Sequence, residues 1–528
     1  MHFKRTMAVA ALSFATTLSA VSAQTLTMGV RAGPESIDPH FSALGVHAEA
    51  LKHIYDPLVK SDNELQLQPG LATSWTAISD NIWEFKLREG VTFHDGSAFD
   101  ADDVKFSVER IADVTGPNPA TLYTRQIVET RVIDPMTIHF VTDGPAPTLP
   151  NDLVRLFIVS SDAAEGLTRE TANTTFNSGE AAVGTGPYKF VSWTPRVELV
   201  LDRNDDYWDG AEPWEQVVRK EIDNDASRVA QLRSGQVDII SRVPATDIAS
   251  LEAVDGINVE TSGTVFVFQL DLDMRDQSPQ VSAKDGSELD ANPFQDPRVR
   301  EAIDLAIDRE VLSQIAMEGM GEPANQIVPP STFGYNDTIQ TTSVDVERAK
   351  ELLAEAGYPD GFKFTLSFTV DRLPGDREVG TTLAQMLARV GIEAEANGVP
   401  VSILFSSRAR GEMSATMAGW GTITGEAYYT YSAVAHSNDA DKRLGQFNWR
   451  GYKNDELDAK IEAAKTELDA DSRRQLLSEA AAIFAADRAT IPLVTIKYGW
   501  AHWTDRVTIE RLRADEETLA MDVAPAGQ

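Results

Sequence analysis

The alternation of hydrophobic and polar positions changes character along the chain. Between about residues 60 and 185, short runs have a period of two, as at Trp83, Phe85 and Leu87 and again over residues 138–141. Successive side chains of a strand point to opposite faces, so this spacing is typical of strands with one buried face. We therefore expect a small, mostly antiparallel β-rich region in this part of the chain.

Further along, helical periods alternate with short strands. A helix is predicted to begin at Asp345 and end at Gly357, and an alternating strand follows over residues 364–370. A second helix is predicted over residues 378–390, and Ile392 opens another strand. This αβαβ succession predicts a largely parallel sheet covered by helices.

The length of 528 residues exceeds what one hydrophobic core usually serves, so we expect two or three domains. Residues 273–291 are polar, have no period and carry several acids. We interpret them as a loop between lobes or a surface insertion.

The first residues have the pattern of a secretory signal. Lys4 and Arg5 precede an apolar run from Met7 to about Val21, and small residues follow up to Ala23. We expect a signal peptide that is cleaved after about Ala23. A transmembrane anchor is the alternative, but the run is shorter than the roughly 20 apolar residues that span a bilayer.

The chain contains no cysteine, which excludes disulfides and the lipid anchor that bacterial lipoproteins attach to a cysteine. An export signal without an anchor predicts a periplasmic protein. The formal net charge of −34 argues against nucleic acid and anionic membrane surfaces as partners. The acidic excess either steers cationic or zwitterionic solutes or serves solubility alone.

The motifs of common secreted enzymes are missing. The sequence has no Gly-x-Ser-x-Gly and no His-Glu-x-x-His, and its histidines are scattered without metal-ligand spacing. The Gly184-Thr185-Gly186 segment lacks the third glycine of a dinucleotide site. We therefore predict no catalysis, no cofactor and no metal, although paired carboxylates of a glycosidase type stay open among 81 acidic residues.

Several longer motifs carry a family resemblance. The chain reads WEFKLREGVTFHDGSAFDADDVKFSVER from Trp83, NDDYWDG from Asn204 and PFQDPRVREAIDLAIDRE from Pro293. These segments resemble the bacterial extracellular solute-binding proteins of family 5, the dipeptide, oligopeptide and nickel group that serves ABC importers. The landmarks span nearly all of the chain after the predicted signal peptide.

The resemblance implies an α/β fold in the form of a two-lobed periplasmic binding protein clamp. Each lobe would hold a parallel sheet, and an extra β-rich subdomain would sit on lobe I. The implied division is a signal peptide at 1–23, lobe I at 24–58, 186–272 and 486–528, the β-rich subdomain at 59–185, and lobe II at 273–485. A monomer without a lipid anchor would capture a small-molecule ligand between its lobes and deliver it to the membrane permease of the importer.

The resemblance also implies site residues. In dipeptide binders of this family an arginine after a strand of the 364–370 type holds the ligand carboxylate, and Arg372 matches that place. Gly419 and Trp420 match a Gly-Trp pair, but the aspartate that takes the ligand ammonium is missing here, and Glu426 is the nearby acid that would replace it. A surface role for Arg372, paired with a neighbouring aspartate, is the alternative.

Aromatic residues suggest the rest of the site. Tyr428, Tyr429 and Tyr431, together with Trp420, predict an aromatic wall, and Phe41 would face the cleft. Packing within their own lobe is the alternative for the tyrosines. Our leading hypothesis is a short peptide or a peptide-like zwitterion; an oligosaccharide or opine-type ligand is the alternative within binding proteins, and a secreted hydrolase is the alternative from another class.

Overall fold

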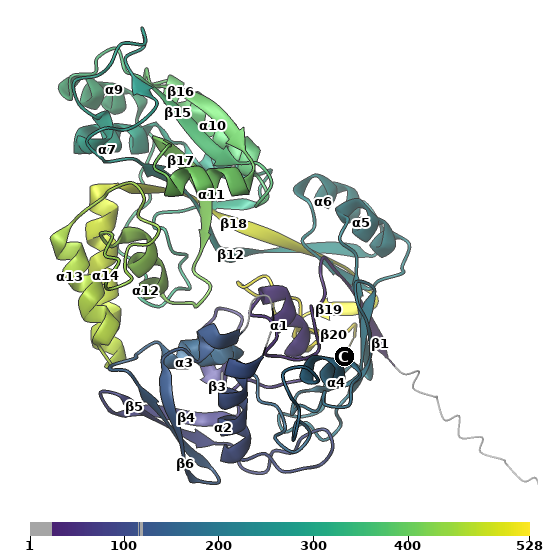
Figure 1. Cartoon of the computed structure of the whole chain (residues 1–528). Helices are drawn as coiled ribbons and strands as arrows, with labels where there is room; N and C mark the ends of the chain where they lie inside the picture. Colours follow the sequence, from purple (N-terminus) through teal and green to yellow (C-terminus); the bar gives the residue numbers. More distant parts are fainter. Residues whose placement is uncertain (1–23, 115, 117–119, 528) are drawn as a thin grey trace, which may run out of the picture.

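The computed structural model describes residues 24–114, 116 and 120–527, so the predicted signal peptide lies outside the described residues. A mixed sheet of twelve strands runs through both halves of the molecule (Figure 1). Two long strands, β12 (Ile257–Leu272) and β18 (Thr490–Trp503), pair antiparallel and join the halves. The crossing of these two strands is therefore the connection between the lobes.

The remaining strands of the large sheet fall into two groups, which define the lobes below. Lobe I holds β1 (Thr25–Val30), β8 (Tyr188–Thr194), β9 (Glu198–Arg203), β10 (Gln216–Glu221) and β11 (Ile239–Ser241). Lobe II holds β13 (Val281–Ser282), β14 (Gly321–Pro323), β15 (Lys363–Thr369), β16 (Glu393–Val399) and β17 (Ala415–Gly421).

Each lobe has a parallel centre with antiparallel strands around it. In lobe I, β1 pairs parallel with β10 and β11, and in lobe II β15 pairs parallel with β16 and β17. The strands β8, β9, β12, β13 and β18 pair antiparallel. The two-lobed α/β architecture is confirmed, with a sheet that is more mixed than the helical periods alone predict.

A second, antiparallel sheet lies on lobe I. Its strand order is β4 (Ala72–Ser79), β5 (Ile82–Leu87), β7 (Thr137–Thr142), β6 (Ile127–Asp134). The helix α2 (Ala101–Arg110) packs beside it, and its first turn is closed by a capping box between Asp100 and Asp103. Two short strands, β2 (Val59–Ser61) and β3 (Leu67–Pro69), pair next to it. These strands are the predicted β-rich region.

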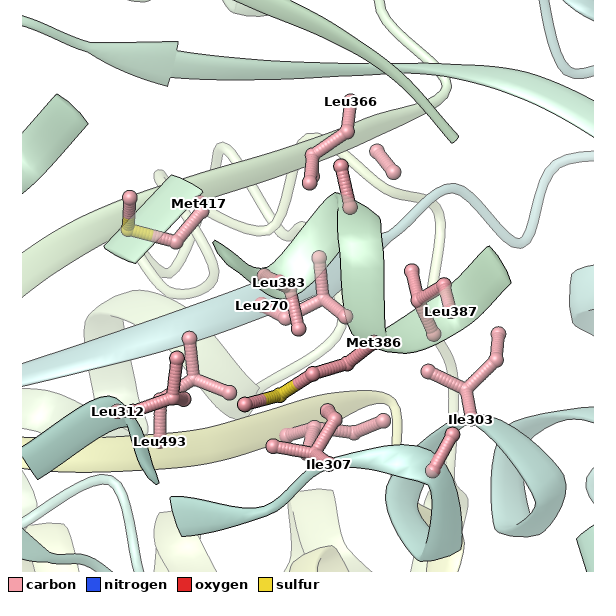
Figure 2. Packing of buried hydrophobic residues seen from close by; sticks show 14 of the residues in the cluster. Leu270, Ile303, Ile307, Leu312, Leu366, Leu383, Met386, Leu387, Met417 and Leu493 are labelled. Atoms are coloured by element: carbon pink, nitrogen blue, oxygen red, sulfur yellow. The ribbon is translucent and has the colours of Figure 1, made fainter. Parts of the chain in front are cut away.

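The core of lobe II forms where helices cover its part of the sheet. Figure 2 shows Leu270 of β12, Leu366 of β15 and Leu383 of helix α10 (Asp376–Ala388) packed together. Two further helices, α7 (Pro297–Ala306) and α9 (Val346–Glu355), begin at capping aspartates whose carboxylates accept backbone N–H groups. Burial of each such leucine contributes roughly 1.5–3 kcal/mol, so this layer holds β15 and α10 rigidly in place.

The other helices flank the lobes. Lobe I carries α1 (Gly45–Leu51), α3 (Leu149–Asp152), α4 (Ala172–Asn177), α5 (Asp225–Arg233) and α6 (Ala245–Glu252). Lobe II carries α8 (Arg309–Val311), α11 (Val401–Ala409), α12 (Ala427–Thr430), α13 (Asp455–Thr466) and α14 (Ala470–Asp487). Two strands near the end, β19 (Val507–Ile509) and β20 (Val523–Pro525), pair antiparallel. Among the described residues, none of the helices has the length and apolar character to cross a membrane.

The polar segment 273–291 has one feature that its lack of period did not predict. It forms β13, which pairs with the start of β15 at the edge of the sheet through Val281 and Phe364. The remainder is loop, as a surface insertion on lobe II would be. The domain boundaries given above remain predictions.

Candidate ligand site between the lobes

A cavity of about 400 Å³ lies where lobe I, lobe II and β18 meet. In Figure 1 this is the region between α6, α10 and β18. Its size is within the range of about 300–1,000 Å³ that small-molecule sites occupy. Residues that line it include Arg31, Asp225 and Arg242 of lobe I, Met317 and Arg372 of lobe II, and Tyr498 of β18.

The cavity lies at the carboxyl ends of the central parallel strands. In lobe I, β1 ends at Val30 and Arg31 follows directly. In lobe II, β15 ends at Thr369 and Arg372 lies three residues further on. Side chains beyond the carboxyl ends of parallel strands are where α/β sheets bind ligands. The two lobes therefore present corresponding edges, each with an arginine, to the same space.

The Arg372 loop is held by the start of α10. The carboxylate of Asp376 accepts the backbone N–H groups of Arg372, at 3.0 Å, and Leu373, at 2.9 Å. Gly375 begins the helix with φ of 81°, in the left-handed region that glycine adopts without strain. Burial raises the pKa of Asp376, while these N–H donors and the charge of Arg372 oppose the rise. The loop thus has a fixed backbone from which the guanidinium projects.

The side chain of Arg372 contacts backbone and an aromatic ring rather than a carboxylate. Its Nη1 donates to the carbonyl oxygen of Gly419, and its guanidinium lies 5.2 Å from the centre of the Phe405 ring. Burial lowers its pKa from the ordinary value, and Asp376 opposes the shift. The alternative for Arg372, an ion pair with a neighbouring aspartate side chain, is not among the contacts of the described residues.

Gly419 allows the two predicted segments to approach each other. A Cβ atom at this position would lie 2.2 Å from Cδ1 of Leu373. Any other residue would require the Leu373 side chain to move. The structure therefore brings Arg372 and Gly419 into direct contact, and Gly419 contributes a carbonyl and space rather than a side chain.

Trp420, the next residue, belongs to an aromatic cluster on lobe II. Its Nε1 donates to Oγ1 of Thr430 at 3.0 Å. Its ring centre lies 5.9 Å from that of Tyr429 and 5.0 Å from that of Phe447. These rings support one another, and they are not among the residues that line the Arg372 cavity.

Glu426, Tyr428 and Tyr431 are engaged within lobe II. Glu426 is buried and forms an ion pair with Arg473. Burial raises the pKa of Glu426, and Arg473 opposes the shift. The Arg473 guanidinium also lies 5.6 Å from the centre of the Tyr428 ring. Tyr431, which is 1% exposed, packs edge-on against Phe484. Tyr431 is thus packed within its own lobe, whereas Glu426 and Tyr428 also lie near lobe I, since the charge of Glu426 adds to the raised pKa of Asp152 and Arg125 opposes the raised pKa of Tyr428.

Phe41 lies in a different cavity of about 300 Å³ on lobe I, together with Phe106 and Arg110. The Arg110 guanidinium there forms a two-pronged ion pair with Asp38, at 2.8 and 3.0 Å. The structure therefore does not bring Phe41 to the Arg372 cavity.

Sequence patterns did not single out Arg31, Arg242 or Tyr498. Arg242 forms an ion pair of 2.7 Å with Glu516 and lies 5.1 Å from the centre of the Tyr498 ring. Burial raises the pKa of Glu516 to about 7, although Arg242 lowers it. The position of Arg31 directly after the alternating apolar run of residues 25–30 was the one available signal.

Comparison with known proteins decides the family. The model of bacterial extracellular solute-binding proteins, family 5 (middle), matches residues 66–442. The chain belongs to this family. The resemblance that the separate motifs indicated is thereby confirmed. Members of this family bind solutes for transport.

Curated relatives and solved structures agree along nearly the whole length. Glutathione-binding protein GsiB of Salmonella paratyphi A is 27% identical over 506 residues, 94% of each chain, and that of Escherichia coli O157:H7 is 29% identical over 504 residues, 93% of each. A nickel ABC transporter structure from Bacillus halodurans has a TM-score of 0.79 at 25% identity and covers 95% of this chain and 99% of its own. The periplasmic binding protein DppA of Helicobacter pylori, in complex with the peptide STSA, has a TM-score of 0.69 at 27% identity and covers 95% and 98%.

Proposed function

We propose that this protein captures a short peptide or a peptide-like polar solute in the periplasm and delivers it to the permease of an ABC importer. The observation that supports this most directly is the cavity lined by both lobes, with the guanidinium of Arg372, which donates to the carbonyl oxygen of Gly419, on one wall. Relatives named for glutathione binding, and a similar structure that holds a peptide, point to the same ligand class.

The geometry suggests how capture works. A ligand carboxylate can accept two N–H groups from the planar guanidinium of Arg372, which recognises a peptide end whatever its side chains. A solute that touches both lobes stabilises their closed arrangement, because it gains contacts there that the open arrangement lacks. Since β12 and β18 are the connection between the lobes, they are where the relative movement would take place.

We propose further that the solute is released chemically unchanged. Export by the predicted signal peptide, a periplasmic location, a monomeric state and the lack of a lipid anchor belong to the same proposal. An oligosaccharide or opine-type ligand in the same transport role is the second candidate.

A thermal-shift screen tests the ligand class. The purified protein is heated with glutathione, di- to tetrapeptides, opines, oligosaccharides or metal ions, and a compound that binds the native state raises the Tm. We expect peptides or glutathione to give the largest shifts and mass spectrometry to recover them intact. Shifts produced by sugars alone would refute the peptide proposal, and cleaved ligand would refute simple binding.

A further inference from the structure

The cavity holds a second arginine, Arg31, whose surroundings differ from those of its cationic neighbours. The strand β1 lies between β10 and β11 and pairs parallel with both, so its carboxyl end is at the centre of the lobe I edge. Arg31 follows this strand, and its side chain is exposed and lines the cavity. Within residues 24–114, 116 and 120–527, it has no hydrogen bond or ion pair to another side chain.

The other cationic side chains of lobe I and β18 in this cavity already have carboxylate partners. Arg242 pairs with Glu516 at 2.7 Å, and Lys497 pairs with Glu322 at 2.9 Å. By contrast, Arg372 donates to a carbonyl oxygen, and in the described part of the chain neither it nor Arg31 has a carboxylate partner. Two guanidinium groups, one from each lobe, therefore have no ion pair within the described part of the chain, and of these Arg372 feels the nearby charge of Asp376.

The acidic side chains of the cavity are of two kinds. Asp225 forms an ion pair with Arg228 at 2.6 Å. The other three, Asp371, Glu318 and Glu378 of lobe II, have no ion pair among the described residues, although Asp371 accepts the backbone N–H of Val401 at 2.8 Å. These carboxylates suit a ligand ammonium, so they do not cancel the need for anions at the two arginines.

Closing the lobes on a solute removes both guanidinium groups from water. An arginine that is desolvated without a partner opposes closure, whereas a charge-assisted pair with a ligand carboxylate favours it. A ligand with a single carboxylate can satisfy Arg372 and leaves Arg31 unpaired. A ligand with two separated carboxylates can pair with both and so bridge the lobes.

We infer that Arg31 is a ligand-binding residue and that the solute carries two separate carboxylates, one for Arg31 and one for Arg372, beside one ammonium group. This inference rests on the proposed function and narrows its ligand class to peptide-like solutes of net charge −1. Arg31 then selects among peptides, while Arg372 provides the contact that all of them share.

Calorimetric titration of the full-length mature protein tests the inference with matched probes. The probes are glutathione, which has two carboxylates and one ammonium, and its monoethyl ester, in which the glycine carboxylate is blocked. A second pair is the tripeptide Ala-Glu-Ala and its amide counterpart Ala-Gln-Ala. We expect the wild type to bind the dicarboxylate of at least one pair about tenfold or more tightly than its partner, since a charged contact is lost.

The variant Arg31→Gln should remove this preference and bind both members of the pair alike. Arg31→Lys keeps the charge without the planar fork and should retain part of the preference. Arg377→Gln is the matched control, because Arg377 is an exposed arginine of α10 that does not line the cavity, and it should behave as wild type. The ligand-free Tm of Arg31→Gln should not change, since the side chain is exposed.

Each contrary result has a distinct meaning. Equal affinity for both members of each pair, or an unchanged preference in Arg31→Gln, overturns the inference; if binding still depends on Arg372, the proposed function stands. Binding of uncharged sugars that is insensitive to both arginines overturns both. Failure of every dicarboxylate probe to bind at millimolar concentration also counts against the inference.

Discussion

Two segments of lobe II were predicted to touch the ligand, and the structure treats them differently. The Arg372 loop lines the cavity, with its backbone fixed by Asp376 and its guanidinium directed to a carbonyl and a ring. The segment from Glu426 to Tyr431 faces inward, where Glu426 pairs with Arg473 and Tyr431 packs on Phe484. A side chain with suitable chemistry can bind a ligand only where no neighbouring residue already occupies its charge or its hydrogen-bonding groups.

This contrast predicts that the inward segment governs stability. Replacing Glu426 with Ala leaves the buried guanidinium of Arg473 without its partner, and loss of one member of a buried pair costs about 3–5 kcal/mol. Urea denaturation should show this loss, whereas the exposed control Glu456→Ala should not. An unchanged free energy of unfolding together with lost ligand binding would instead place Glu426 in the site.

The Arg372 loop should show the opposite pattern. Arg372→Ala removes the carboxylate contact and should weaken peptide binding by roughly 2 kcal/mol or more, about 30-fold in Kd, while the free energy of unfolding stays nearly constant. Calorimetry on wild type, Arg372→Ala and the control Arg377→Ala measures it. Full affinity in Arg372→Ala would show that Arg372 does not bind the ligand and would favour a sugar ligand.

Acidification should strengthen binding of an anionic solute. Burial raises the pKa of Glu516 to about 7, so in the folded protein this carboxyl gains a proton as the pH falls through about 7 and leaves Arg242 without its counter-charge. Titrations from pH 8 to 6 should show affinity that rises about two- to fivefold on acidification. In Glu516→Gln, which imitates the protonated form, this rise should be absent.

Protonation of the Glu516 carboxyl group also affects the stability of the folded protein. Its folded pKa lies above the ordinary value, so between about pH 7 and 4.5 the folded state holds a proton that the unfolded chain has released. Its contribution to the free energy of unfolding therefore grows as the pH falls through that window. Denaturation of wild type and Glu516→Gln at both ends of the window checks the sign, and a contribution that shrinks on acidification would contradict it.

The smallest effect is expected for Tyr429. Its ring packs beside Trp420 rather than in the cavity, so Tyr429→Ala should cost about 1 kcal/mol of stability and change peptide affinity less than about threefold. Calorimetry and thermal melting of this one variant give both numbers. A loss of affinity above tenfold would restore the aromatic wall as a ligand contact.

Local periods and motifs predicted much of the fold. The alternation of apolar and polar residues from Trp83 to Leu87 predicted the antiparallel sheet. The alternating helices and strands after Asp345 predicted the parallel strands β15 and β16. These features depend on neighbours in sequence. The mixed character of the large sheet was not predicted, because it depends on β12 and β18, whose strands begin more than 200 residues apart.

Site residues could be predicted from the sequence only where they lie within a recognisable motif. The match of Arg372 and Gly419 to family positions placed two residues that are in contact. The pairing of Arg242 with Glu516 joins positions 274 residues apart, and no local pattern reveals it. The same holds for the role that we propose for Arg31, which depends on the lobe II residues that line the cavity with it.

Hydrogen–deuterium exchange with and without the best ligand of the thermal-shift screen tests the location of the site most directly. We expect saturating ligand to slow exchange together in segments around residues 30–34, 242–247 and 371–378, which border the cavity from both lobes. Protection confined to one lobe, or to the segments around Phe41 and Arg110, would contradict it.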